Sequence, residues 1–328
     1  MTAPLLEAKE LVKQFRVGSA LSFSNATVHA LSGVSFEVIA GETLAIVGES
    51  GCGKTTLARC LVGLIEPTSG TLLVAGEDAR DLLRRDSLQF HRLIQIVFQD
   101  PYASLNPRRT VSQSVGDGLR LHNICARGDR NGTVVHLLAQ VGLSREHLDR
   151  YPHELSGGQR QRVAIARALA VGPRVLICDE PVSALDVSVQ AQVINVFNRL
   201  QRELGVAYVF ISHNLALVRH ISQRIAVMYF GQIVEMGTTR ELRRVLRHPY
   251  SQILFAATPQ IGRKAAHRPP HALADEMPSP LAPPSGCRFR TRCPFARGRC
   301  GAEEPELREV DGVSVRCHFA EEVAKAPG

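Results

Sequence analysis

The chain has 328 residues, 45% of them hydrophobic and 21% charged, which is enough for one large globular domain with an appendage or for two smaller domains. Its formal net charge of +8 suits nucleic acid, an anionic membrane surface or a phosphate ligand equally well, so charge selects no partner. Glu7, Lys9 and Glu10 stand where a secretory signal would need an apolar core, and no apolar run is long enough to span a bilayer. We therefore expect a cytosolic chain that reaches a membrane only through a partner.

Segments rich in Val, Ile and Leu alternate with longer amphipathic stretches between Leu44 and about Met236. This alternation predicts parallel strands joined by crossover helices, that is, an α/β fold. Residues 111–150 lack the alternation and are predicted to form a mostly helical lobe inserted between strands. The predicted strands cover residues 43–47, 94–98, 175–178, 207–211 and 224–229.

A phosphate-binding loop is predicted directly after the first of these strands. Its sequence, Gly-Glu-Ser-Gly-Cys-Gly-Lys-Thr, fits the GxxxxGK[ST] pattern and is followed by a helix-like stretch, which is the context that the motif requires. The glycines let backbone N–H groups approach the phosphates, Lys54 supplies a positive charge to them, and Thr55 offers its hydroxyl to Mg²⁺. The predicted ATP-binding residues of this loop are Gly48, Glu49, Ser50, Gly51, Cys52, Gly53, Lys54, Thr55 and Thr56.

Two carboxylates follow the apolar strand 175–178. Asp179 is predicted to hold Mg²⁺, and Glu180 to act as the base or polarising group for the attacking water. Two acids after an apolar strand are more often a solvated strand end. Beside a phosphate loop, however, the functional interpretation is favoured, because parallel strands present their carboxyl ends at the ligand-binding edge.

A second anion site is predicted at Leu-Ser-Gly-Gly-Gln, residues 155–159, which open a helix with an apolar stripe and exposed arginines. Ser156, Gly157, Gly158 and Gln159 would present N–H groups and a small hydroxyl at this helix N-terminus. Two anion sites for one nucleotide fit a pair of subunits that enclose ATP between them, each giving its phosphate loop to one nucleotide and its Ser156 turn to the other. A plain glycine-hinged helix start is the alternative.

Taken together, these motifs resemble those of the ATP-binding cassette (ABC) family, in the family's order from about residue 5 to 237. The resemblance implies a phosphate-loop NTPase cassette with a mostly parallel sheet core, an inserted helical lobe at about 100–170 and an antiparallel β edge. It also implies that Gln99 senses Mg²⁺ and the permease, and that His213 contacts the γ-phosphate, so that Glu180, His213 and Gln99 form the catalytic set. Thr55, Gln99 and Asp179 would surround Mg²⁺.

The same resemblance assigns two further residues. Asp186 would lie in a loop that contacts the opposite subunit. Phe15 occupies the place where the family stacks an aromatic ring on adenine, and it keeps the π-face that stacking needs. Phe23 is a weaker candidate for that role.

Residues 97–107 and 248–259 resemble the corresponding segments of oligopeptide, dipeptide and nickel importers. The resemblance implies an ATP-hydrolysing subunit, peripheral on the cytoplasmic face of the membrane, that powers import of peptides. Its implied partners are a second ATP-binding subunit, with a heterodimer favoured over a homodimer, two transmembrane permease subunits and an extracytoplasmic substrate-binding protein. No nucleic acid is expected. The alternatives are import of nickel or another small solute, and a soluble cassette protein that acts on nucleic acid or the ribosome.

The C-terminal part holds four of the eight cysteines, Cys287, Cys293, Cys300 and Cys317. Composition divides the chain into a cassette domain at 1–260, a Pro-rich linker at 261–285 and a cysteine-rich module at 286–328. The cysteine spacing is neither a common zinc pattern nor a ferredoxin pattern, but so short a segment favours metal because it has little apolar core. Resemblance to the peptide importer branch implies a 4Fe–4S cluster. Zinc and unligated thiols are the alternatives, and His318 is a possible replacement ligand.

Overall fold

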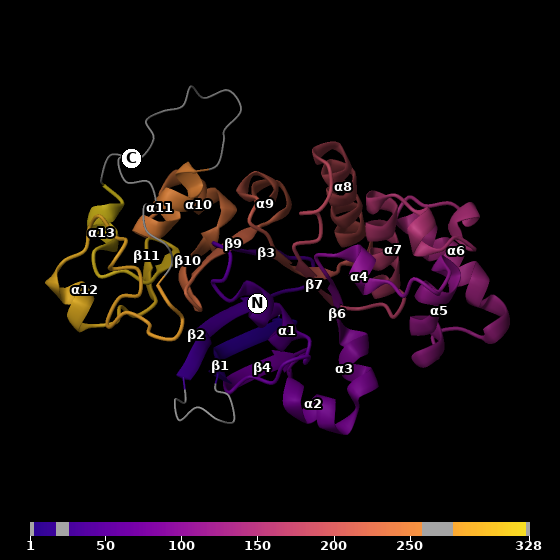
Figure 1. The fold of residues 1–328 in the computed structure, drawn as a ribbon, viewed down its shortest axis with the longest axis horizontal. Helices are drawn as coiled ribbons and strands as arrows, with labels where there is room; N and C mark the ends of the chain where they lie inside the picture. Colours follow the sequence, from indigo (N-terminus) through magenta and orange to yellow (C-terminus); the bar gives the residue numbers. More distant parts are fainter. Residues whose placement is uncertain (1–2, 18–25, 258–277, 326–328) are drawn as a thin grey trace.

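The parallel strands expected from the sequence form the centre of an eight-stranded mixed sheet (Figure 1). The computed structural model describes residues 3–17, 26–257 and 278–325. The strand order is β11-β12-β10-β9-β3-β8-β7-β6, and β9, β3, β8, β7 and β6 run parallel. The central strands are buried on both faces, as parallel strands between helices must be. These strands are β3 (Thr43–Val47), β6 (Ile94–Val97), β7 (Val175–Asp179), β8 (Ala207–Ile211) and β9 (Arg224–Tyr229), so every predicted strand is confirmed to within one residue at its ends.

The C-terminal segment extends this sheet with antiparallel strands. β10 (Gln232–Thr238) pairs with β9, β12 (Val313–Val315) pairs with β10, and β11 (Arg308–Val310) pairs with β12. The helices of this region are α10 (Thr239–Arg244), α11 (Pro249–Ala256), α12 (Gly298–Ala302) and α13 (Ala320–Val323).

The cysteine-rich residues are therefore joined to the cassette rather than set apart from it. Phe289 and Val313 are buried in one apolar cluster with Tyr229 and Tyr250. A separate module was expected because residues 286–328 contain few apolar side chains, but the segment uses the core of the cassette instead. Of the predicted linker at 261–285, residues 261–277 lie outside the described residues.

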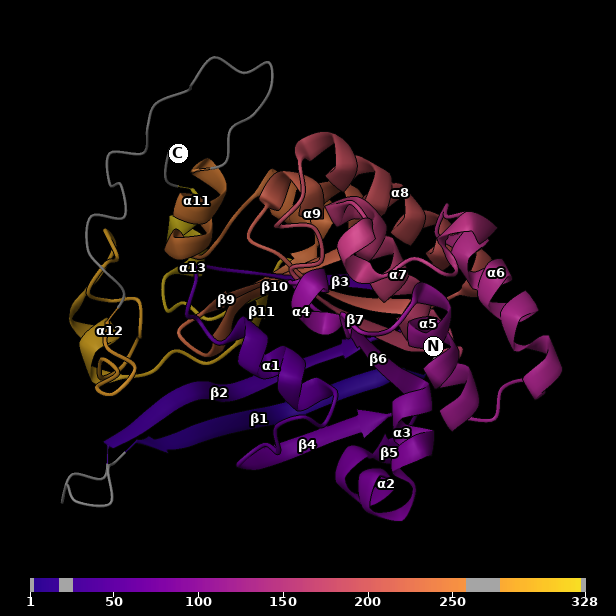
Figure 2. The same cartoon turned by 45° about the vertical axis from the view of Figure 1, so that its right-hand side comes forward.

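A second, four-stranded antiparallel sheet lies against the other side of the phosphate-loop helix α1 (Lys54–Leu61), as Figure 2 shows. Its order is β2-β1-β4-β5. Leu6, Leu31, Leu57 and Ile46 share one buried cluster, which joins this sheet, α1 and the main sheet. The elements are β1 (Leu6–Val17), β2 (Ala26–Val38), β4 (Ser69–Val74) and β5 (Glu77–Asp78), followed by α2 (Ala79–Arg85) and α3 (Ser87–Leu93).

Between β6 and β7 every residue is described and none is in a strand. The helices of this lobe pack with α8 (Val187–Leu204) through a shared core that includes Val115, Leu138, Ile165 and Phe197. α9 (Leu215–Ile221) follows β8. In the described ranges, no helix combines the length and apolar character needed to cross a bilayer. The helices of the lobe are α4 (Pro101–Ser104), α5 (Val111–Leu121), α6 (Arg130–Gln140) and α7 (Gly157–Leu169), with short 3₁₀ turns at Arg127–Asp129, Arg145–His147 and Pro152–Glu154.

Candidate active site

Four loops at one edge of the main sheet carry the residues that the motifs single out. Because β3, β8, β7 and β6 are parallel neighbours, the segments after their carboxyl ends lie at the same edge. Gly48 and Glu180 directly follow β3 and β7, and Gln99 and His213 stand two residues after β6 and β8. The fold thus brings together residues that are far apart in the sequence.

The phosphate loop, residues 48–55, adopts backbone shapes that glycine permits. Gly51 and Gly53 have φ angles of 80° and 107°, in the left-handed region that side chains disfavour. A Cβ atom added at Gly48 would lie 2.2 Å from the carbonyl oxygen of Met228, so the loop backbone passes directly over β9. α1 begins at Lys54 without a side-chain cap, which leaves the N–H groups of its first turn available for an anion.

The ammonium group of Lys54 lies within this loop. It donates hydrogen bonds to the carbonyl oxygens of Gly48 and Glu49, at 2.8 and 2.7 Å. The side chain is buried, so its charge is directed into the loop rather than into solvent. Lys54 is therefore positioned to exchange a carbonyl partner for a phosphate oxygen.

Asp179, the last residue of β7, has a buried carboxylate oxygen without a partner. The residue is 4% exposed, and its Oδ1 accepts no hydrogen bond within the described part of the chain. Burial raises the pKa of this carboxyl above its usual value, whereas the hydroxyl of Thr55 lowers it. A buried carboxylate beside a hydroxyl supplies the oxygen ligands that Mg²⁺ prefers, so these two residues fit a magnesium ion.

Glu180 and His213 form a pair next to Asp179. His213 Nδ1 lies 3.1 Å from Glu180 Oε2, and the two side chains are 60% and 17% exposed. The backbone of Glu180 has a φ of 48°, which is unusual for a residue with a side chain and is held by a hydrogen bond from its N–H to the carbonyl of Ile211 at 3.0 Å. The carboxylate is thus fixed in a strained position, where it can orient a water molecule.

The Ser156 turn begins α7, as predicted. The Ser156 hydroxyl accepts from the N–H of Gln159, and the Gln159 side chain accepts from the N–H of Ser156, which is a capping box. A Cβ atom added at Gly158 would lie 2.4 Å from Cγ1 of Val189, because the turn packs closely on α8. Ser156 is exposed, and no hydrogen bond in the described residues links it to the phosphate loop.

The remaining predicted residues lie at the surface or in the antiparallel sheet. Gln99 and Asp186 are exposed, and Asp186 directly precedes α8. Phe15 lies on β1 opposite Val28, with the ammonium of Lys13 5.0 Å from its ring centroid. Phe23 lies outside the described residues.

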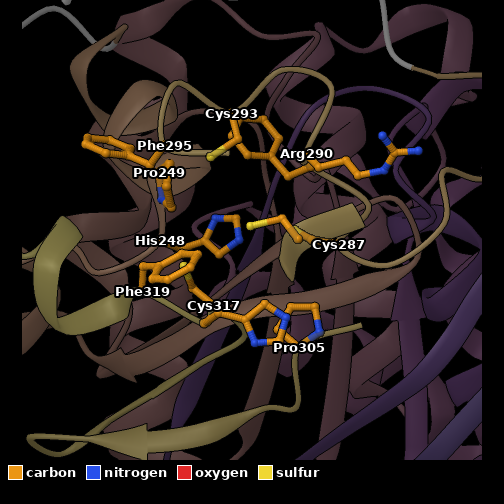
Figure 3. Close-up of a pocket in the computed structure, with 12 residues that line it drawn as sticks. His248, Pro249, Cys287, Arg290, Cys293, Phe295, Pro305, Cys317 and Phe319 are labelled. Atoms are coloured by element: carbon orange, nitrogen blue, oxygen red, sulfur yellow. The ribbon is translucent and has the colours of Figure 1, made fainter. Parts of the chain in front are cut away.

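The four C-terminal cysteines line one pocket, which Figure 3 shows with His248 facing Cys287. Burial raises the pKa of Cys293 to about 12 and that of Cys317 to about 11. Across residues 3–17, 26–257 and 278–325, however, no three His, Cys, Asp or Glu side chains are grouped as ligands for a metal ion. The thiols therefore share a pocket, but the predicted metal site is not confirmed.

The side chain and the backbone of Glu49 are held by residues far along the chain, and these contacts could not be predicted from the sequence. Arg292 forms an ion pair with its carboxylate, and the hydroxyl of Tyr250 accepts a hydrogen bond from its N–H. The motif identifies Glu49 only as a variable position of the phosphate loop. Since these partners come from the C-terminal segment, only the folded chain reveals them.

Comparison with known proteins agrees with this geometry. Residues 31–183 match the ABC transporter family, and residues 234–300 match the family described as the oligopeptide/dipeptide transporter C-terminal region. The chain is 49% identical over 318 residues to the di/tripeptide transport ATP-binding protein DppF of Pseudomonas aeruginosa, covering 97% of this chain and 98% of that protein. It is 48% identical over 318 residues to the dipeptide transport ATP-binding protein DppF of Escherichia coli, covering 96% and 94% of the two chains.

A solved structure gives the same result for the fold. The ATP-binding cassette MJ0796, in a dimeric post-hydrolysis state bound to ADP and Pi, is 28% identical with a TM-score of 0.64, covering 72% of this chain and 99% of that one. The resemblance inferred from the motifs is thereby confirmed. The chain belongs to the ABC transporter family of ATPases, in the branch with the oligopeptide/dipeptide transporter C-terminal region.

Proposed function

We propose that this chain hydrolyses ATP to power the import of di- or oligopeptides through membrane permease subunits. The carrying observation is the single sheet edge at which the phosphate loop, the buried carboxylate of Asp179 and the Glu180–His213 pair meet. The names of the relatives, which are di/tripeptide and dipeptide transport ATP-binding proteins, support peptide as the cargo. Import of nickel or another small solute, the alternative considered from the sequence, is not favoured by these relatives.

Each group at this edge has a role in hydrolysis. Residues 48–56 would bind the phosphates, and the buried ammonium of Lys54 would exchange its hydrogen bond to the Gly48 carbonyl for one to a phosphate oxygen. Thr55 and Asp179, together with Gln99, would hold Mg²⁺, which when bound would supply positive charge to the phosphate oxygens. Glu180 takes a proton from water as the water oxygen attacks the γ-phosphorus and the bond to ADP breaks.

His213 completes this step by contacting the γ-phosphate. Its Nδ1 is near Glu180, so the other ring nitrogen remains for the phosphate. Phe15 contributes a π-face for adenine from the antiparallel sheet. These roles follow from residue chemistry and from the place of each residue in the family's motifs.

The second anion site serves a neighbouring cassette. Ser156 and Gly157 are exposed at the start of a 13-residue helix, where backbone N–H groups can meet a phosphate held by another subunit. Asp186 lies on the same contact surface. The dimeric state of the MJ0796 cassette bound to ADP and Pi supports this arrangement. For this branch we favour a related second ATP-binding subunit over a second copy of the same chain.

The dimer proposal has a direct test. An E180Q variant, which retains ATP, should migrate as a dimer in size-exclusion chromatography with ATP, either alone or with the second subunit. Ser156→Arg in that background should abolish the ATP-dependent dimer, because the bulky cation cannot enter the nucleotide interface. An ATP-dependent dimer that survives this change would contradict the proposed role of the Ser156 turn.

The remaining partners are two permease subunits and an extracytoplasmic substrate-binding protein, with this chain peripheral on the cytoplasmic face of the membrane. The permeases would contact the Gln99 region and the helical lobe. Co-purification from detergent-solubilised membranes, followed by peptide uptake in proteoliposomes that contain the purified complex, tests the proposal. ATP-dependent uptake of dipeptides supports it, and recovery of the chain only with ribosomes or DNA would overturn it.

The cysteine pocket suggests a further component of this function, a 4Fe–4S cluster held by Cys287, Cys293, Cys300 and Cys317. Four thiols line one pocket, and an all-thiolate set of four is the ligand set that iron–sulfur clusters use. Arg290 lines the same pocket and would offset the negative charge of the cluster. When bound, such a cluster can accept or donate one electron and can cross-link the segment.

Anaerobic purification with iron and sulfide analysis tests this assignment. Iron and sulfide in equal amounts, lost in a Cys317→Ser variant, are expected. A colourless protein that contains zinc, or no metal, would contradict the cluster and leave the ATPase proposal unaffected.

A further inference from the structure

Two stretches of chain that line the cysteine pocket also hold Glu49 of the phosphate loop. We propose that Arg292 and Tyr250 are positioning residues for this loop, through which the cysteine pocket sets the affinity of the chain for ATP. The inference rests on the proposed ATP site and adds a C-terminal control to it.

The first connection is a two-bond ion pair. Arg292 Nη1 lies 3.0 Å from Glu49 Oε2 and Nη2 lies 3.4 Å from Oε1, while the Arg292 side chain is only 5% exposed. A guanidinium with two parallel hydrogen bonds to a carboxylate fixes the orientation as well as the position of that carboxylate. Because Cys293 is the next residue and lines the pocket, any shift of that cysteine is transmitted to Arg292 through one peptide unit.

The second connection runs through α11. The hydroxyl of Tyr250 accepts a hydrogen bond from the N–H of Glu49 at 2.8 Å, and the residue is fully buried. Two residues earlier, His248 lines the cysteine pocket, and its Nδ1 accepts from the N–H of Tyr250 at 3.1 Å. The same turn therefore contacts the pocket at one end and the phosphate loop at the other.

The ring of Phe289 packs between the two connections and joins them into one cluster of aromatic side chains. Its ring centroid lies 5.5 Å from that of Tyr250, 5.7 Å from that of His248 and 5.1 Å from that of Tyr229. The guanidinium of Arg292 lies 5.9 Å from the centroid of the Tyr229 ring. Since interiors are close-packed, a displacement on the pocket side has to move these rings together rather than one at a time.

A displacement of Glu49 should directly change the binding of the nucleotide. Its carbonyl oxygen accepts a hydrogen bond from the ammonium of Lys54 at 2.7 Å, and it directly follows Gly48, whose backbone passes over β9. A change at Arg292 or Tyr250 therefore moves the backbone that places Lys54. Neither residue belongs to the catalytic pair Glu180–His213, so ATP affinity should change more than the rate of the chemical step.

The test uses R292Q, R292K and Y250F in the full chain, with ATP affinity measured by titration of a fluorescent ATP analogue and with KM and kcat measured by steady-state hydrolysis. We expect R292Q to raise Kd and KM by about tenfold and Y250F by about threefold, with kcat within about twofold of wild type. R292K keeps the positive charge but cannot make two parallel hydrogen bonds to the carboxylate. Its Kd and KM should therefore lie between those of R292Q and wild type. The matched control is R299Q, because Arg299 pairs with Glu303 at an exposed position of the same segment and should change nothing.

Coupling to the pocket is tested by a double-mutant cycle. Cys317 lines the pocket, and no hydrogen bond or ion pair in the described residues links it to Glu49. Cys317→Ser should weaken ATP binding in the wild-type background and have little further effect in R292Q, and additive effects would overturn the coupling. Thermal unfolding of every variant identifies any that fail to fold. If one of R292Q, R292K and Y250F does not fold, the ATP affinities of the other two still test the proposal.

The two proposals fail in different ways. A wild-type chain that does not bind ATP would overturn the proposed function together with this inference. Wild-type affinity in both R292Q and Y250F would overturn the inference alone.

Discussion

The two ends of the eight-stranded sheet differ in what they hold: one positions polar groups for chemistry, and the other joins the cysteine-rich segment to the core. At the β3–β8–β7–β6 edge, loops after parallel strands hold polar groups in positions that are costly for a folded chain, such as the unpartnered carboxylate oxygen of Asp179 and the left-handed backbone of Glu180. At the β10–β12–β11 end, β11 and β12 have only three residues each, and aromatic packing around Phe289 supports this region. The comparison indicates that chemistry is concentrated where neighbouring parallel strands, buried on both faces, provide rigidity, and that the cysteine end depends on the same core for its own order.

The largest effect expected is on the chemical step at the first end. E180Q should lower ATP turnover by about 10²- to 10⁴-fold while ATP still binds, because a positioned base typically contributes that much. Steady-state hydrolysis and nucleotide titration measure the two quantities separately. Unchanged turnover would show that Glu180 is not the base. It would also contradict the assignment of chemistry to this end of the sheet.

The next effect concerns the packing at the second end. F289A should reduce the free energy of unfolding by about 3–5 kcal/mol, since it deletes a fully buried ring. Chemical denaturation measures the loss, and Leu281→Ala is the matched control because Leu281 is 49% exposed. A small loss in F289A would mean that the cysteine segment is not supported by the core of the cassette.

The smallest effect concerns the turn into α10, where Thr238 and Glu241 form a capping box. Thr238→Ala should cost about 1 kcal/mol of stability and leave hydrolysis unchanged. Hydrogen bonds from Thr238 lower the pKa of Glu241 below its ordinary value of 4.5 in the folded chain. The folded state therefore favours the carboxylate, so its contribution is present above pH 4.5 and is lost as pH falls through the lowered pKa. The difference between the thermal melts of the two proteins should narrow at acid pH, and parallel pH profiles would contradict this account.

Much of the β3–β8–β7–β6 edge could be predicted from the sequence, because its functional residues lie in short local motifs. The phosphate loop, Asp179 and Glu180 each lie within a short motif, and the period of the apolar residues places them after strands. The strands themselves were predicted to within one residue, since buried parallel strands are nearly continuous apolar runs.

The second end could not be predicted in the same way. Composition suggested a separate module, because the sequence around Cys287 has few apolar residues. β12 nevertheless pairs with β10, and the pairing of Glu235 with Val315 is set by tertiary structure rather than by local pattern. The contacts of Arg292 with Glu49 join residues 243 positions apart, for which the sequence contains no signal.

Glu180 and His213 are linked twice, through their side chains and through the hydrogen bond from Glu180 N–H to Ile211, which lies two residues before the histidine. The spacing between the backbones of the acid and the histidine is therefore part of the framework of the sheet. If this pair is stationary, the reaction has to be switched on and off from elsewhere, and in the dimer that we propose the neighbouring subunit would do so. The catalytic pair would then stay in place, and the neighbouring subunit would set the timing of hydrolysis.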